Sequence, residues 1–152
     1  MVITREIDYA FRAIRALSGG SRLNTKAICQ KENIPMDFTY KILKKLSQSG
    51  IVSIERGVAG GYILTADLAR ITLYDVIKAV DEPLLLSVCM DCHYSCPNNT
   101  GEKNCMIHEE LCRVQQAVVE ELKRKSFAEI FGMCGCLDES CPAKRDNECE
   151  VV

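Results

Sequence analysis

Apolar residues recur every three or four positions over three stretches of the first fifty residues, which is the spacing of one helix face. The first stretch begins near Ile3 and stops at Gly19. The second is short, and either Asn24 or Thr25 can cap its start. The third covers about residues 36–48. We therefore predict three helices in the amino-terminal third of the chain.

The second and third of these helices are separated by a tight break at residues 32–35, which ends in a proline. The third helix carries Tyr40 and several lysines among its polar positions. Its apolar positions, which we expect to be buried, are Phe38, Ile42, Leu43 and Leu46. Two short helices joined in this way, the second of them basic, are typical of a helix-turn-helix.

The hydrophobic period changes from helical to extended after Gly50. Residues 51–55 predict a strand, residues 61–64 predict its partner, and residues 56–60 connect the two as a hairpin loop. Glycines in this loop allow the backbone to approach a phosphate, and Arg56 can enter a minor groove. We interpret the hairpin as the wing of a winged helix.

The second half of the chain predicts a further helix from Thr72 to about Val80, an irregular stretch, and a long helix over residues 105–125. The apolar stripe of the long helix consists of Ile107, Leu111, Val114, Val118 and Leu122. Because this helix lies beyond an already closed domain, we expect it to pair with its copy in a second subunit. Ser126 is expected to cap a last short helix that ends near Phe131.

These elements predict a mainly α-helical fold with a small β-hairpin wing, that is, a winged helix-turn-helix plus a long dimerisation helix. We expect a DNA-binding domain at residues 1–82, a cysteine-rich cluster-binding loop at residues 83–105, and the dimerisation helix with the short terminal helix at residues 106–131. The cysteine-containing tail at residues 132–152 has little apolar content and is expected to be flexible. We find no nucleophile–base constellation and no phosphate loop, so we do not expect an enzyme.

Basic residues are concentrated in the amino-terminal half of the chain. Residues 1–71 hold 11 Lys and Arg against 6 Asp and Glu, a net charge of +5, whereas the remainder holds 8 against 15, a net charge of −7. A basic region on an acidic protein favours a local nucleic-acid surface. The residues that we expect to contact DNA are Arg5, Thr25, Lys26, Thr39, Tyr40, Lys41, Lys44, Arg56, Gly60 and Gly61.

Nine of the ten cysteines lie after residue 88. The first residues carry too many charges for a signal peptide, and the sequence has no uncharged apolar run of ~20 residues. We therefore expect a cytoplasmic protein with no membrane segment. In that compartment, crowded thiols favour metal ligands or redox groups over a disulfide framework.

Four segments resemble a known family of regulators. They are residues 3–10, residues 34–46 followed by residues 49–52, the wing segment at residues 56–62, and Val80-Asp81-Glu82 just before the cysteine loop. In these segments the chain is similar to the IscR/NsrR-type regulators, winged-helix dimers that sense iron–sulfur, nitric oxide or redox status. The resemblance implies a repressor that binds a palindromic operator in double-stranded DNA as a homodimer.

The resemblance also implies a ligand set for an iron–sulfur cluster, 2Fe–2S in preference to 4Fe–4S. The three cluster cysteines of the family fall on Cys89, Cys96 and Cys105. The fourth ligand is His108, as in IscR-type members, or Asp8, where NsrR-type members carry a carboxylate.

The residues themselves leave two alternatives open. Cys89-x-x-Cys92 together with Cys105-x-x-His108 is a zinc pattern, although the cysteines gathered in this region outnumber the ligands that one zinc ion needs. The other alternative is a thiol switch without metal. The alternative function is therefore a winged-helix protein with a structural zinc site or a thiol redox switch. We assign no role to Cys112 or to the tail cysteines Cys134, Cys136, Cys141 and Cys149.

Overall fold

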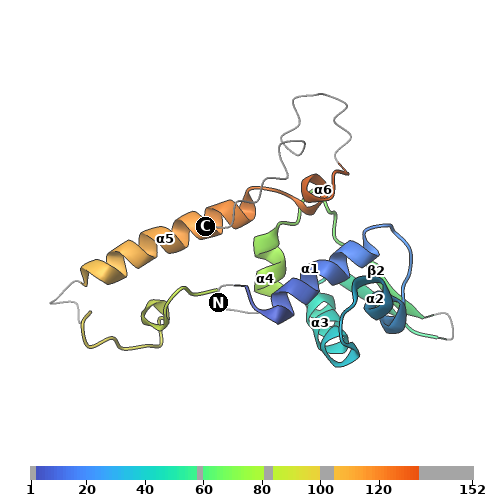
Figure 1. Ribbon diagram of the computed structural model, residues 1–152, viewed down its shortest axis with the longest axis horizontal. Helices are drawn as coiled ribbons and strands as arrows, with labels where there is room; N and C mark the ends of the chain where they lie inside the picture. The colour runs from blue at the N-terminus through green and yellow to red at the C-terminus, as the bar shows by residue number, and fades with distance from the viewer. Residues whose placement is uncertain (1–2, 58–59, 81–83, 100–104, 134–152) are drawn as a thin grey trace, which may run out of the picture.

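Helices dominate the computed structural model of the chain, which describes residues 3–57, 60–80, 84–99 and 105–133 (Figure 1). The elements in chain order are α1 (Arg5–Leu17), α2 (Thr25–Glu32), α3 (Met36–Gln48), β1 (Val52–Glu55), β2 (Gly61–Leu64), α4 (Leu73–Val80), the short 3₁₀ helix η1 (Val88–Met90), α5 (Met106–Lys123) and α6 (Phe127–Ile130). The predicted fold class, mainly helical with one antiparallel hairpin, is confirmed. None of the helices among the described residues is long and apolar enough to span a membrane.

Helix α1 forms the centre of the amino-terminal domain. Its first turn is capped by Thr4, whose hydroxyl oxygen accepts a hydrogen bond from the Ile7 amide at 3.3 Å, and the helix therefore begins two residues after Ile3. Its apolar face, which includes Ile14 and Leu17, is fully buried and lies against α2, α3 and α4. The domain core therefore forms around a single helix.

The break between α2 and α3 is a tight turn with a left-handed residue. Asn24, rather than Thr25, caps α2, because its Oδ1 accepts a hydrogen bond from the Ala27 amide at 2.8 Å. Asn33 then adopts a φ of 53°, a conformation that asparagine tolerates better than most residues, and Pro35 precedes the first turn of α3. The predicted helix-turn-helix is thus present. An ion pair between Arg15 of α1 and the buried Glu32 fastens α2 to α1.

The wing is a two-stranded antiparallel hairpin in which Val52 pairs with Leu64 and Glu55 pairs with Gly61. The first strand starts at Val52 and not at Ile51, because the Ile51 amide donates to the carbonyl of Leu46 at the end of α3. A bridge between Leu23 and Tyr62 attaches the hairpin to the segment before α2. Wing residues 58 and 59 lie outside the described part of the chain.

Two capping boxes mark the starts of α4 and α6, as the sequence predicts. At α4, Thr72 and Asp75 exchange hydrogen bonds between side chain and backbone. At α6, Ser126 and Glu129 do the same, and these hydrogen bonds hold the pKa of the Glu129 carboxyl below its usual range. Phe127, the first residue of α6, is buried against Phe11 of α1 and Phe131.

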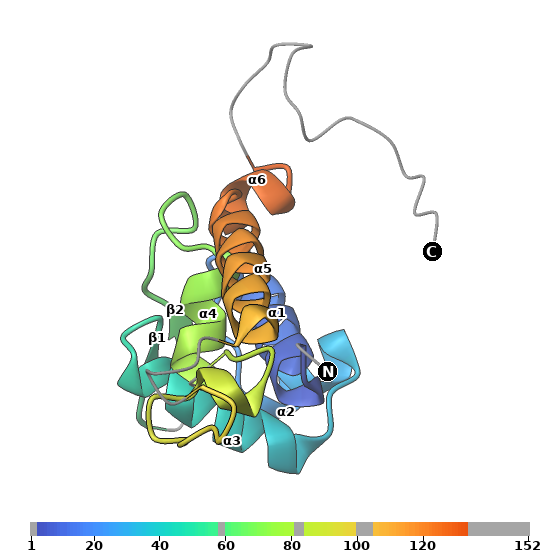
Figure 2. The same ribbon diagram turned by 90° about the vertical axis from the view of Figure 1, so that its left-hand side faces the viewer.

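Helix α5 projects away from the helix-turn-helix and the wing (Figure 1) and passes over α4 (Figure 2). None of its residues is buried, and Ile107 in the predicted apolar stripe is 72% exposed. In one chain, the apolar side of α5 therefore has only partial cover from α4 and η1.

We predict that Phe127→Ala lowers the free energy of unfolding by about 3–5 kcal/mol, because it removes a fully buried ring that joins α6 to α1. Tyr40→Ala, an equal truncation at an exposed position, is the control and should change it by about 0.5 kcal/mol or less. Denaturant unfolding at one protein concentration measures both. Equal losses for the two variants would contradict the assigned role of Phe127.

Candidate DNA interface and cysteine centre

The first turns of α3 present an exposed aromatic and basic surface. Tyr40, Lys41 and Lys44 are all exposed, as expected for residues that enter a major groove. The prediction that Phe38 is buried is wrong: its ring contacts Tyr9 of α1 edge-on at 5.6 Å between centroids, yet the residue stays 43% exposed. Phe38 therefore adds exposed apolar surface to the first turn of α3, of a kind that suits contact with thymine methyl groups.

Thr39 faces the protein interior, and the expectation that its side chain contacts DNA is wrong. It is 1% exposed, its hydroxyl donates to the Pro35 carbonyl at 3.0 Å, and the same oxygen accepts a hydrogen bond from the Cys29 thiol at 3.2 Å. The spacing along α3 could have predicted this burial, because Thr39 lies one turn before the buried Ile42 and Leu43 and therefore on the same face. Thr25 is 7% exposed, which leaves its side chain little surface for a phosphate.

The remaining cations of the sequence prediction are exposed. Arg5 opens α1, Lys26 lies in the first turn of α2, and Arg56 directly follows β1. Lys45, the neighbour of Lys44, behaves differently. Its Nζ donates to the Val80 carbonyl at 2.6 Å and lies 2.8 Å from Glu6 Oε1, so this lysine is held by the protein itself.

Gly60 and Gly61 are required by the hairpin itself. A Cβ at Gly60 would lie 2.5 Å from the Glu55 carbonyl oxygen, and one at Gly61 would lie 2.8 Å from the Leu23 carbonyl oxygen. A larger residue at either position therefore disturbs the wing whether or not DNA approaches it. Contact of these two glycines with DNA stays a prediction.

Four of the cysteines lie in the segment that leads to α5. Cys89 lies in η1, Cys92 and Cys96 follow it, and Cys105 is the residue that precedes the first turn of α5. The six cysteines of the described residues are all free thiols, and Cys89 Sγ lies 3.3 Å from Ser87 Oγ. The tail cysteines, like Asp81 and Glu82, lie outside the described residues.

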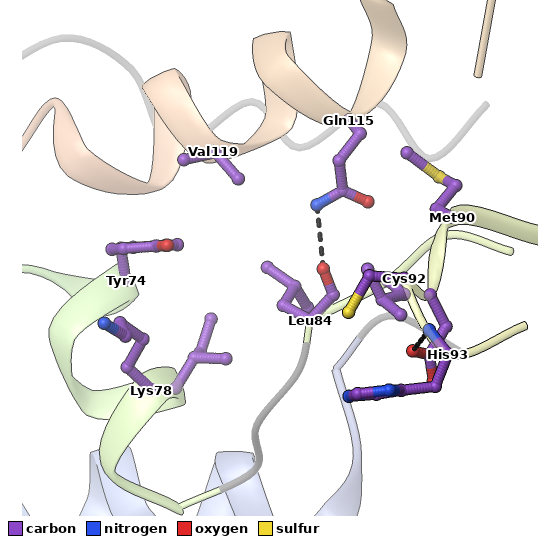
Figure 3. A pocket seen from close by; sticks show the side chains of 11 residues that line it. Tyr74, Lys78, Leu84, Met90, Cys92, His93, Gln115 and Val119 are labelled. Carbon is purple, nitrogen blue, oxygen red and sulfur yellow. Dashed lines mark hydrogen bonds between the residues drawn. The ribbon is translucent and has the colours of Figure 1, made fainter. Parts of the chain in front are cut away.

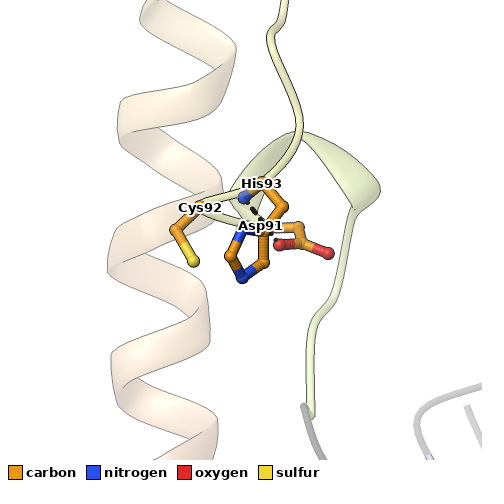
Figure 4. A group of neighbouring side chains, drawn as sticks. All are labelled: Asp91, Cys92 and His93. Carbon is orange, nitrogen blue, oxygen red and sulfur yellow. Dashed lines mark hydrogen bonds between the residues drawn. The ribbon is translucent and has the colours of Figure 1, made fainter.

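Within the described residues, one group meets the spacing for a single ion, and it is not the expected one. Asp91, Cys92 and His93 bring a carboxylate, a thiol and an imidazole within 4.8 Å of one another (Figure 4). The Asp91 Oδ1 also accepts a hydrogen bond from the His93 amide at 2.9 Å. The expected set of Cys89, Cys96, Cys105 and His108 is not gathered to that spacing; ligands of a two-iron cluster are shared between two metal atoms and span a wider site.

His108 has an unusual environment one turn into α5. Its Nε2 lies 3.4 Å from the sulfur of Cys112, one helical turn further on. Its Nδ1 is buried and has no hydrogen-bond partner among the described residues. Asp8, the other predicted fourth ligand, forms an ion pair with Arg12 at 2.8 Å on α1. Its role as a ligand stays a prediction.

A cavity of about 670 Å³ separates the cysteine loop from α4 and α5 (Figure 3). Tyr74 and Lys78 of α4, Val119 of α5, and Cys92 of the loop contribute to its walls. Across it, the side chain of Gln115 bonds to the backbone at Leu84 (Figure 3).

The helix-turn-helix, the hairpin beside it and the exposed basic recognition helix define a winged-helix DNA-binding protein. A family model described as Rrf2, iron-dependent transcriptional regulator, matches residues 3–132. The chain belongs to this Rrf2 family of transcriptional regulators.

Relatives and solved structures agree with this assignment. A Neisseria meningitidis protein named as an HTH-type transcriptional regulator is 32% identical over 100 residues, which is 64% of this chain and 62% of that relative, so the match spans less than two thirds of its length. The HTH-type transcriptional regulator IscR of Xenorhabdus nematophila is 36% identical over 62 residues, 41% of this chain and 38% of its own.

Two solved structures share the fold. IscR of T. potens has a TM-score of 0.63 at 18% identity, covering 86% of each chain. CymR, described as the global cysteine regulator of B. subtilis, has a TM-score of 0.67 at 21% identity, covering 86% of this chain and 96% of its own.

We predict that Lys41→Ala and Arg56→Ala each weaken binding to a duplex selected from a random-sequence pool, because each removes an exposed cation from the interface. The slope of log affinity against log salt should fall in magnitude by about one for each phosphate that the variant no longer neutralises. Arg124→Ala, which removes an exposed cation directly after α5, is the control and should leave the slope as it is. If Lys41→Ala or Arg56→Ala keeps the parent slope and affinity, that residue does not contact DNA.

Proposed function

We propose that this regulator represses transcription as a homodimer and senses iron–sulfur or redox status through a cluster, 2Fe–2S in type, at the start of α5. Its protein ligands are Cys89, Cys96, Cys105 and His108. The observation that carries the proposal is the buried Nδ1 of His108, which has no hydrogen-bond partner among the described residues although it lies one turn after Cys105.

The surroundings of His108 fit a metal ligand. A ligating histidine uses one ring nitrogen for the metal while a partner holds the other. Here Cys112 lies 3.4 Å from Nε2, which leaves Nδ1 as the metal-facing nitrogen. A buried polar atom without a partner costs free energy, and ligation removes that cost. This argument favours His108 over Asp8, whose carboxylate is paired with Arg12.

The donor set also fits iron and sulfide. Thiolates are soft ligands, and cysteines with histidine support both iron–sulfur clusters and zinc. When bound, the cluster supplies one-electron redox chemistry and sensitivity to iron supply. A structural zinc site is the alternative function, and the grouping of Asp91, Cys92 and His93 within 4.8 Å favours it for a single ion. The exposure of Cys92 and His93 argues against a closed structural site there.

The cluster acts on DNA binding through α5. Cys105 directly precedes this helix and His108 lies in its first turn, so loss of the metal frees that end of the helix from the loop. The partly exposed stripe of α5 supports pairing with a second copy of the chain. In such a dimer, the orientation of α5 sets the separation of the two recognition helices, which must be ~34–36 Å for a palindromic site.

We predict that anaerobically purified protein is coloured and contains iron and acid-labile sulfide in comparable amounts. Cys89→Ala, Cys96→Ala and Cys105→Ala should each lose the cluster, whereas Cys29→Ala should keep it, because Cys29 bonds to Thr39 inside the DNA-binding domain. Absorbance together with iron, sulfide and zinc analysis tests this. Colourless protein with one zinc per chain, refractory to cluster reconstitution, would support the zinc alternative.

The same measurement separates the candidates for the fourth ligand. His108→Ala should change the visible spectrum of the reconstituted protein, and Asp8→Ala should not. The reverse result would assign the fourth ligand to Asp8 and would leave the buried Nδ1 of His108 without a metal role.

A further inference from the structure

The side chain of Gln115 attaches the start of the cysteine loop to α5. Its Nε2 donates to the Leu84 carbonyl at 2.9 Å (Figure 3). Its Oε1 accepts a hydrogen bond from the Leu86 amide at 2.9 Å. The amide thus pairs with the loop backbone as a neighbouring strand does, with both of its polar ends used. Leu86 is three residues before Cys89, so Gln115 fixes the position from which the cysteine segment begins.

Lys45 provides a second attachment on the other side of the same region. Its Nζ donates to the carbonyl of Val80, the last residue of α4, at 2.6 Å, and it also pairs with Glu6 of α1 at 2.8 Å. A lysine is well suited to the carbonyl end of a helix. Since Lys45 lies on the recognition helix α3, the end of α4 is bonded directly to the element that reads DNA.

We infer that Gln115 and Lys45 are positioning residues that together couple the cysteine loop to the recognition helix, an inference that rests on the proposed function. Val80 and Leu84 are four positions apart, and each is held by a side chain from a different helix. A displacement of the loop when its metal is lost acts on α5 through Gln115 and on α3 through the Val80–Lys45 contact. Both residues act through their neighbours, and neither is assigned to DNA or to the metal.

Neighbouring residues supply matched controls for both positions. Gln115→Leu keeps the size of the side chain and removes both hydrogen bonds, while Gln116→Leu makes the same change at an exposed position of α5. Lys45→Met removes the contact with Val80, while Lys44→Met removes an exposed lysine of the proposed DNA interface.

The experiment measures operator affinity of each full-length variant with the cluster loaded and with it removed, at several salt concentrations. The parent ratio of the two affinities should be ~5–150-fold. In Gln115→Leu and Lys45→Met, the affinities with and without the cluster should differ by about threefold or less, and the salt slope should be unchanged. Gln116→Leu should keep both the ratio and the slope. Lys44→Met should keep the ratio but lower the slope by about one, because it removes a cation that neutralises a phosphate.

A second readout does not depend on the cluster. Hydrogen exchange of the Leu86 amide should be faster in Gln115→Leu than in the parent and in Gln116→Leu, also in the metal-free protein, because its acceptor is gone. If the parent ratio is present and Gln115→Leu or Lys45→Met retains it in full, the coupling inference fails while the proposed function stands. If the parent itself binds equally with and without the cluster, the proposed function fails and the inference fails with it.

Discussion

Packing on the apolar face of α1 holds the other elements of the DNA-binding domain in place. Ile14 and Leu17 are fully buried, and α2, α3 and α4 all lie against this helix. Each such side chain contributes about 1.5–3 kcal/mol when it leaves water. Because the recognition helix and α4 share one support, their relative positions are set by the same core. Phe11 of α1 also contacts Phe127 of α6. The segment that follows α5 is therefore packed against α1 as well.

Helix α5 differs from these helices in its burial. None of its residues is buried in a single chain, and its two ends are anchored in different ways. At its carboxyl end, α6 docks through Phe127 and through hydrogen bonds to the backbone of Leu68 and Ile71. At its amino end, Cys105 joins α5 to the cysteine loop, and further along the helix Gln115 forms two hydrogen bonds with the start of that loop.

Much of the fold was accessible from the sequence because apolar periodicity reports burial directly. The helices α1 to α6 and the hairpin follow from it, and the family assignment agrees. The faces at the start of α3 were harder to assign. The apolar Phe38 is exposed and the polar Thr39 is buried, the reverse of what we expected. The position of a residue around the helix axis, rather than its polarity, decides whether it lies on the buried face with Ile42.

Long-range polar contacts account for the remaining differences. Nothing local distinguishes Lys45 from Lys44, since the difference lies in a carbonyl 35 residues away. Gln115 has no ionisable or metal-binding group, so the sequence predicts no role for it. In the structure its side chain forms hydrogen bonds with two backbone groups of the loop. The cysteines could be named from their spacing, but spacing along the chain does not determine which thiols meet one metal.

Control of DNA binding by the cysteine centre is tested most directly by operator affinity, measured by fluorescence anisotropy at one salt concentration. The loaded protein, the same preparation after cluster removal, and Cys89→Ala are compared. We expect loaded and metal-free protein to differ at least ~5-fold and Cys89→Ala to behave as the metal-free form. Affinities within about twofold of one another for all three would contradict this control.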